Sequence, residues 1–259
     1  MARYNQVDPE TLVNPVKKTP EFGRGAWAKA GIDFAGVYAL APEGEKRIGT
    51  QAEKSLAHWA TAAATLDIQR ELKAAGFNPG DLDGVFGPDS DKAVRAFQKS
   101  KGLTDDGRFG PMSARALFTP GIDAAEDKYD IPNHYLRGMI SAESALDPGA
   151  VGYFIYYGAS LEYRGVDRGV GQINSKAHPE IEWLDAFKFR YAADYTAKRL
   201  RDTFDSLKKS YPKQTNTVLW DAAICSHNNP AAARTWARDG AAPTQAAADY
   251  VRRVKVAVY

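Results

Sequence analysis

The chain has 259 residues, of which 44% are hydrophobic and 25% are charged, and its formal net charge is +2. This length accommodates one large domain or two ordinary ones, and the composition is typical of a soluble globular protein. Because proteins that bind nucleic acid usually carry a clustered basic face, the nearly neutral charge does not predict nucleic acid as a partner.

Three further patterns exclude other classes of protein. Cys225 is the only cysteine, so an internal disulfide is excluded. No apolar run is long enough to span a membrane, and the N-terminus lacks the apolar segment of a signal peptide. The four histidines show no metal-ligand spacing, so neither a metal nor another cofactor is predicted. We therefore expect a protein made in a cytoplasm, without stable membrane insertion.

The first part of the chain is difficult to interpret. Pro9, Pro15 and Pro20 interrupt residues 1–61, which we interpret as an N-terminal arm of unknown role. Residues 66–77 then show the periodicity of an amphipathic helix that ends at a glycine.

Residues 62–118 contain an internal repeat. DGVFGPDSDKAVRAF begins at Asp83 and DGRFGPMSARALF begins at Asp106, and both copies read D-G-x-F-G-P-x-S before a helical stretch. The Asp-Gly pairs predict turns, and the Gly-Pro pairs lead into helices. We expect Phe86 and Phe109 to fill apolar cores beside these turns.

The signature of this block extends beyond the two turns. The further positions that fit it are Ile68, Gln69, Leu72, Ala75, Gly76, Phe77, Ala93, Val94, Phe97, Gln98, Gly102, Leu103 and Leu117. In this order they resemble the small three-helix peptidoglycan-binding domain that many cell-wall enzymes carry. The resemblance implies bacterial peptidoglycan as a partner, with candidate binding residues beside the turns at Asp83, Phe86, Asp106 and Phe109.

The remainder of the chain shows a mostly helical pattern. Residues 118–132 combine proline, glycine and a charge cluster, and we interpret them as the boundary to a second domain over 119–259. A flap or strand pair is predicted within 153–165, a long amphipathic helix over 187–211, and two helices separated by a break over 217–240. The residues expected on the inward face of the long helix are Tyr191, Tyr195, Leu200 and Phe204.

One carboxylate falls on the apolar face of a predicted helix. Asp130-Ile131-Pro132 predicts the start of this helix, with Asp130 able to cap it, and Asp147-Pro148 predicts its end. Leu136, Met139 and Ile140 recur at helical spacing, and Glu143 lies on the same stripe. Partial burial favours the protonated form of a carboxyl group, which is the form that glycosidic bond cleavage needs as its acid. The alternative is a glutamate that reaches solvent from the helix end or pairs with an arginine.

Three ordered motifs give this glutamate a context. They are ISAESALDPGAVG around Glu143, DRGVGQINSKAHP from Asp167 and SHNNP from Ser226. They resemble the motifs of lytic transglycosylases and goose-type lysozymes, although His227 and Pro230 stand where that family has tyrosine and glycine. The resemblance implies a lysozyme-like, mostly helical catalytic domain in which Glu143 is the general acid and later the general base.

The same resemblance implies that four further residues contact the substrate. Ser144 would orient a sugar substituent, while Gln172, Tyr191 and Asn228 would line the cleft. Another interpretation stays open for each of these three: Gln172 pairs only with backbone, Tyr191 belongs to the core, and Asn228 caps a helix. The criterion that separates a substrate-binding role from a purely structural one is the convergence of polar groups in one cleft.

A second carboxylate decides the type of reaction. Goose-type lysozymes have an aspartate after the Q-[IV] pair, and this chain has Asn174 there. Asp167 and Asp147 are the remaining candidates for a residue that activates water. With one clear carboxylate we favour the transglycosylase route, in which the 6-hydroxyl of muramic acid attacks and no second base is needed.

The domain order and the absence of a signal peptide resemble modular phage endolysins. The resemblance implies a monomer made in a host cytoplasm that acts on the cell wall after release, and a holin is implied only in this indirect way. Two alternatives to a lytic transglycosylase stay open: a hydrolytic muramidase acting on the same bond, and a non-enzymatic wall-binding protein of a phage particle.

Overall fold

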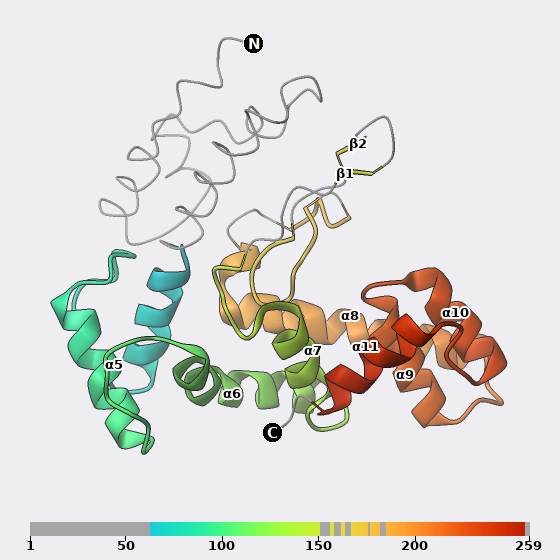
Figure 1. The fold of residues 1–259 in the computed structure, drawn as a ribbon, viewed down its shortest axis with the longest axis horizontal. Helices are drawn as coiled ribbons and strands as arrows, with labels where there is room; N and C mark the ends of the chain where they lie inside the picture. Colours follow the sequence, from blue (N-terminus) through green and yellow to red (C-terminus); the bar gives the residue numbers. More distant parts are fainter. Residues whose placement is uncertain are drawn as a thin grey trace, which may run out of the picture. The chain divides into compact units, whose positions relative to one another are not determined.

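The computed structural model is mainly helical, as the sequence predicts (Figure 1). It divides into two compact units, one comprising Met1–Leu117 with Asp147–Phe189 and the other Phe118–Leu146 with Arg190–Tyr259. The predicted N-terminal arm lies outside the residues that the structure describes, and the predicted division into 62–118 and 119–259 stays a prediction. The described residues are 63–150, 156–157, 162–163, 167–175, 177–181 and 185–256.

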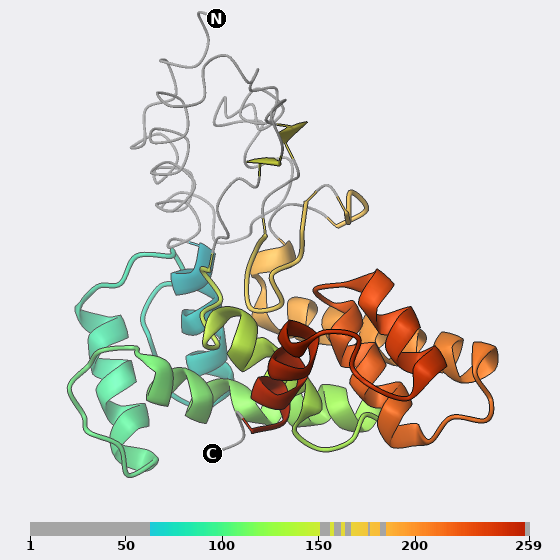
Figure 2. The same ribbon diagram turned by 45° about the vertical axis from the view of Figure 1, so that its right-hand side comes forward.

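Three helical segments form the N-terminal part of the first unit. Residues 63–74 are helical, α5 spans Pro88–Ser100 and α6 begins at Pro111 (Figures 1 and 2). α5 starts with a proline and carries acidic residues in its first turn, both of which favour a helix N-terminus. The predicted helix ending at Gly76 and the helices after both turns are confirmed. The core between these segments contains Leu66, Leu72, Val94, Phe97 and Leu117, all buried.

The two copies of the repeat are built around buried glutamine amides. In the first copy, Gln69 Nε2 donates to Asp83 Oδ1, Val85 O and Ser90 Oγ, each at 3.1 Å, and Gln69 Oε1 accepts from Gly84 N at 2.9 Å. Because one amide satisfies four polar groups of the loop, it fixes the path of the turn.

The second copy repeats this network at equivalent positions. Gln98 Nε2 donates to Asp106 Oδ1, Arg108 O and Ser113 Oγ at 2.9–3.0 Å, and Gln98 Oε1 accepts from Gly107 N at 3.0 Å. The D-G-x-F-G-P-x-S motif is thus the sequence of a loop that wraps a glutamine from the preceding helix.

Phe86 does not fill an apolar core, so the prediction is wrong for this residue. Phe86 is 43% exposed and Phe109 is half-buried. The amides of Gln69 and Gln98 are the buried groups to which the two loops hydrogen-bond.

A buried carboxylate of the first helix binds the backbone of Phe189, which is the last residue of the first unit and the first of α8 (Phe189–Ser210). Asp67 is buried, and its Oδ2 accepts a hydrogen bond from the backbone N of Phe189 at 2.6 Å. Burial raises the pKa of Asp67 from 3.8 to about 7, and the negative charge of Glu71 adds to the rise, while the bond from Phe189 opposes it.

The strand pair predicted within 153–165 is present. β1 (Tyr156–Tyr157) and β2 (Glu162–Tyr163) pair antiparallel, with Tyr156 opposite Tyr163 and Tyr157 opposite Glu162.

The second unit begins within α6, which spans Pro111–Lys128 and continues through Pro120. The segment interpreted as an interdomain boundary is therefore helical as far as Lys128. α6 also supplies the cap of α7 (Tyr135–Ser144): the buried carboxylate of Glu126 accepts from His134 N at 2.8 Å, Leu136 N at 2.9 Å and Arg137 N at 3.2 Å. Negative charge at a helix N-terminus is stabilising, so Glu126 fixes where α7 begins.

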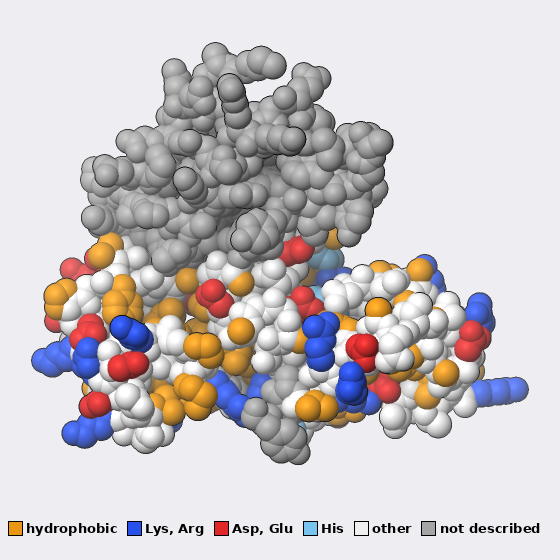
Figure 3. Space-filling view, viewed as in Figure 1, with side chains coloured by type: hydrophobic (Ala, Val, Ile, Leu, Met, Phe, Trp, Pro, Cys, Tyr) orange, Lys and Arg blue, Asp and Glu red, His pale blue; other side chains and the backbone are white. Residues whose placement is uncertain are grey.

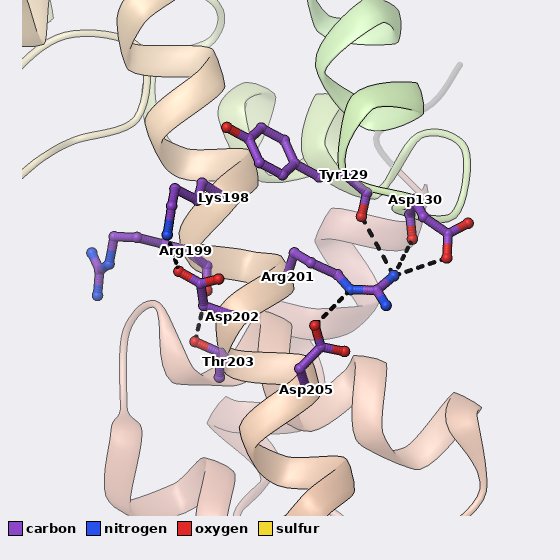
Figure 4. Close-up of polar contacts among 8 residues, drawn as sticks. All are labelled: Tyr129, Asp130, Lys198, Arg199, Arg201, Asp202, Thr203 and Asp205. Carbon is purple, nitrogen blue, oxygen red and sulfur yellow. Dashed lines mark hydrogen bonds and ion pairs between the residues drawn. The ribbon is translucent and has the colours of Figure 1, made fainter.

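Asp130 does not cap α7, contrary to the sequence prediction, because an arginine of α8 binds it. Asp130 has a φ of 48°, and Arg201 Nη1 donates to its backbone O at 3.0 Å and to its Oδ2 at 2.9 Å (Figure 4). The same guanidinium donates to Tyr129 O at 3.4 Å and, through Nε, to Asp205 at 2.9 Å. Arg201 therefore ties the turn after α6 to α8.

The two helices predicted over 217–240 are confirmed as α9 (Asn216–Ser226) and α10 (Pro230–Asp239), which pack against each other. α11 (Gln245–Val256) packs against α7 and α9. The approach of α7 to α11 is close at Gly138, where an added Cβ would lie 1.9 Å from Val254 O. The C-terminal helices thus bring the end of α7 next to α9 and α11.

Candidate functional site

Glu143 lies in the last turn of α7, as predicted. The helix ends at Ser144, because Ala145 and Leu146 both adopt left-handed conformations with φ of 54° and 67°. Such values are uncommon for residues other than glycine and indicate a strained exit from the helix. The chain therefore leaves the helix before Pro148 is reached, and Glu143 is held one residue from this exit.

A tyrosine of α11 binds this carboxylate. The hydroxyl of Tyr250 donates to Glu143 Oε1 at 2.5 Å, and only 15% of the Glu143 side chain is exposed. Burial raises the pKa of Tyr250 well above its usual range, and the charge of Glu143 and their hydrogen bond raise it further. Tyr250 is therefore a neutral hydrogen-bond donor at ordinary pH.

A histidine approaches the same carboxylate oxygen from α9. His227 follows the last residue of that helix, and its Nε2 lies 3.9 Å from Glu143 Oε1. Both contacts are made to Oε1, and no hydrogen-bond donor of the described residues contacts Oε2. Tyr250 of α11 therefore holds one oxygen of Glu143, and His227 at the end of α9 lies near the same oxygen.

The sequence analysis missed Tyr250. Ala247, Tyr250, Val251 and Val254 form the buried face of α11, so the tyrosine follows the pattern of an ordinary core residue. No signal in the sequence separates a core tyrosine from one whose hydroxyl meets a carboxylate 107 residues away.

The predicted substrate-binding residues of this unit have different environments. Ser144 Oγ donates to Ile140 O at 3.1 Å within α7. Asn228 is exposed, and Asn229 rather than Asn228 caps α10, by accepting from Ala232 N at 2.9 Å. The interpretation of Asn228 as a helix cap is therefore wrong.

Tyr191 does not face inward, contrary to the prediction for the long helix. Its side chain is 39% exposed and stacks on Tyr195, with ring centroids 6.4 Å apart and planes 4° from parallel. Leu200 and Phe204 are buried, as predicted. Tyr191 is therefore a partly exposed residue and not a core residue.

The second motif lies in the other compact unit. Gln172 has a φ of 45°, and its Nε2 donates to Gly169 O at 2.9 Å and Ala150 O at 3.3 Å, so its amide pairs with backbone. Gly169 has a φ of 65°, and an added Cβ would lie 1.9 Å from Ala186 O. The glycine is needed because no side chain fits there.

The candidate second carboxylates also belong to this unit. Asp167 Oδ1 accepts from Asn174 Nδ2 at 2.9 Å, so the residue that replaces the expected aspartate holds another aspartate by its amide. Asp147 is exposed, and its Oδ1 accepts from the backbone N of Gly149 at 2.8 Å in a local turn. Of the two, Asp167 is the one held by another side chain.

The candidate wall-binding residues divide into two kinds. Asp83 and Asp106 hold their own loops, since each Oδ1 also accepts from the backbone N two residues later. This backbone hydrogen bond, together with the bond from Gln98, lowers the pKa of Asp106. Phe86 and Phe109 leave part of their rings accessible, as does the 63% exposed Met112 of the second copy.

We also searched the described part of the chain for metal sites, membrane-spanning helices and large areas of one charge. Within it no three His, Cys, Asp or Glu side chains are grouped to hold a metal, and no helix has the length and apolarity to cross a membrane. Basic and acidic side chains alternate over the face shown in Figure 3, without a large area of one sign.

Comparison with known proteins identifies one part of the chain. Residues 61–117 match the family model "Putative peptidoglycan binding domain", which covers both copies of the repeat. The chain matches no curated protein. The helical segments and the two loops wrapped around Gln69 and Gln98 therefore correspond to a peptidoglycan-binding domain over residues 61–117, which indicates association with the cell wall.

Proposed function

We propose that the chain is an enzyme that cuts the β-1,4 bond between N-acetylmuramic acid and N-acetylglucosamine in peptidoglycan, with Glu143 as its acid and base. The observation that carries this proposal is the asymmetric environment of the Glu143 carboxyl group. Tyr250 holds Oε1 at 2.5 Å, while no donor among the described residues contacts Oε2. A mostly buried carboxyl with one oxygen fixed by a neutral hydrogen-bond donor suits proton transfer to a leaving group through its other oxygen.

In the proposed reaction Glu143 acts twice. Its protonated Oε2 first gives a proton to the glycosidic oxygen as the bond from this oxygen to C1 of muramic acid breaks. The carboxylate then removes the proton from the C6 hydroxyl of the same sugar, whose oxygen bonds to C1 and forms a 1,6-anhydro end. Tyr250 contributes by keeping Glu143 in one orientation and by donating to the carboxylate that forms after the first step.

Hydrolysis of the same bond is the second candidate. It is favoured by the hydrogen bond between Asp167 and Asn174, which gives the second motif a held carboxylate in spite of the missing aspartate. Such a carboxylate would activate a water molecule. This water would then attack C1 of muramic acid, as the C6 hydroxyl does in the transglycosylase reaction. The substitution Asp167→Asn should then abolish cleavage, whereas under the transglycosylase proposal it leaves the anhydro products unchanged.

The peptidoglycan-binding domain would support either reaction by holding the chain on its substrate. Binding to the wall raises the effective concentration of glycan strands near the catalytic residues. The exposed ring of Tyr191 is suited to stacking on a sugar, and Ser144, Gln172 and Asn228 remain our candidates for contacts with sugar substituents. We propose an endolysin of this kind, made in a host cytoplasm and acting on the wall.

Mass spectrometry of muropeptides released from purified peptidoglycan tests the proposal. We expect products lighter by one water than the reducing products of hydrolysis, and none from Glu143→Gln. Reducing muramic ends would replace the transglycosylase by the hydrolase. Normal release by Glu143→Gln would refute the catalytic assignment. If the wild-type chain binds walls but releases nothing, the protein is a non-enzymatic wall-binding protein.

A further inference from the structure

The second compact unit contains a polar pocket that the proposed function does not use. It has a volume of about 460 Å³ and lies between the second half of α8 and the junction of α9 with α10. The described residues that line it include two arginines, Arg199 and Arg234, and one carboxylate, Asp202. Neither Glu143 nor Tyr250 belongs to this described lining, so the pocket is not the environment of the proposed acid.

The charges of the pocket favour an anionic ligand. Its described lining has two guanidinium groups against one carboxylate, and Lys198 Nζ donates to Asp202 Oδ2 at 2.5 Å (Figure 4). Within the part of the chain that the structure describes, no hydrogen bond or ion pair involves the guanidinium of Arg234. The start of α10 at Pro230 adds the partial positive charge of a helix N-terminus. A carboxylate ligand would therefore find an arginine whose donors are not already in use.

Hydroxyl groups in the lining supply hydrogen-bond acceptors. Thr203 Oγ1 donates to Arg199 O, and Ser226 Oγ donates to Ala223 O, each at 2.8 Å. Because each hydroxyl gives its only proton to a helix carbonyl, its lone pairs remain for a donor from outside. The pocket can thus accept from amide N–H groups as well as donate to an anion.

Part of the lining is apolar. Leu207 and Ala233 line the pocket and are 7% and 2% exposed. A simple inorganic anion would make no use of these two side chains. A short peptide with a small apolar side chain, amide groups and a free carboxylate would use the apolar lining, the hydroxyl groups and the guanidinium groups together.

We propose that this pocket binds the carboxylate ends of the short peptides that peptidoglycan carries on its sugar chains. Arg199 and Arg234 hold the carboxylate, and the hydroxyl groups of Thr203 and Ser226 accept from the peptide amides. The match of residues 61–117 to a peptidoglycan-binding family supports this choice of ligand, because the chain then meets such peptides on the wall. The inference goes beyond the proposed function, since it requires no cleavage.

An NMR titration of the full chain tests the inference. The probe is N-acetyl-D-alanyl-D-alanine, which has one free carboxylate, amide groups and small apolar side chains. We expect backbone amide signals within 199–211 and 226–234 to shift and to saturate. Arg234→Gln should raise the Kd about tenfold, because it removes a hydrogen bond between two charged groups. Arg238→Gln is the matched control and should leave the Kd unchanged, since this exposed arginine of the same helix does not belong to the described lining and pairs with Asp239.

Two further probes test which part of the ligand is recognised. The C-terminal amide of the same dipeptide should bind at least about tenfold more weakly, because it lacks the charge. Inorganic phosphate should not saturate the same signals at the concentrations at which the dipeptide does. Equal binding of the amide, equal binding of phosphate, or shifts confined to other residues would each overturn the inference. None of these results affects the proposed function, because the probes contain no glycosidic bond and cleavage is tested separately with Glu143→Gln.

Discussion

The buried carboxyl of Asp67 makes the stability of the protein depend on pH. In the folded chain its pKa is about 7, compared with an ordinary value of 3.8. Between these two values the folded state keeps a proton that the unfolded state releases, so the free energy of unfolding falls as the pH rises. The stabilising contribution is complete at low pH and is lost as the pH rises through the folded pKa. A difference of about three pKa units corresponds to a loss of about 4 kcal/mol.

Asp67→Asn removes this titration while keeping a side-chain oxygen that can accept from Phe189 N. The variant and the wild type should have equal stability near about pH 4, and the variant should be the more stable at about pH 8, by up to about 4 kcal/mol. In thermal unfolding followed by circular dichroism, each kcal/mol should raise the midpoint by roughly 2–4 °C for a protein of this size.

Asp81→Asn serves as the control, because it neutralises an exposed aspartate of the same unit. It should leave the dependence of the midpoint on pH as in the wild type. A constant difference between Asp67→Asn and the wild type across this pH range would refute the reasoning, as would a variant that is less stable at high pH.

Three further substitutions test individual contacts. Tyr250→Phe should lower kcat on soluble glycan strands roughly 100-fold with an unchanged circular dichroism spectrum, and a wild-type kcat would show that its hydroxyl has no part in the reaction. Gln98→Leu should destabilise the protein by about 2–4 kcal/mol in denaturant unfolding, because it leaves loop groups unpaired, whereas the exposed Lys99→Gln should change little. Gly138→Ala should cost about 1–3 kcal/mol and also lower kcat, since it forces α7 away from α11; a folded variant of wild-type stability would contradict the close approach seen at Val254.

Residues that start and end helices, together with apolar periodicity, are sufficient to predict most helices from the sequence. α10 begins with Pro230 and ends at Gly240, whose φ of 79° is the left-handed conformation that glycine favours. The helix over 63–74, α8 and α9 likewise follow their apolar periodicity. These elements depend on residues within a few positions of each other, which a sequence displays directly.

Contacts between distant residues explain the predictions that are wrong. Asp130 is of a residue type that often caps helices. In the structure, however, Glu126 of the preceding helix caps α7, and Arg201 of α8 binds Asp130. Phe86 is of a residue type that is usually buried, but the buried group of its loop is the amide of Gln69, which accepts from Gly84 N. In both cases a polar side chain from another element decides the environment of the residue. Such a contact cannot be predicted from the neighbouring residues in the sequence.

The candidate site shows the same limit most clearly. The sequence predicts Glu143 as a candidate from its place on an apolar stripe, but the contacts on which the proposed role depends come from Tyr250 and His227, which are 107 and 84 positions further along the chain. A carboxyl group with both oxygens exposed would rotate freely and meet a substrate in many orientations. Under the proposed function, with Oε1 held by the neutral hydroxyl of Tyr250 and approached by the imidazole of His227, Oε2 would be the oxygen that exchanges protons. If Glu143 is the acid of the proposed reaction, its environment depends on how α9 and α11 lie against α7, and substitutions at these contacts should affect the reaction as strongly as substitutions of polar residues that contact the substrate.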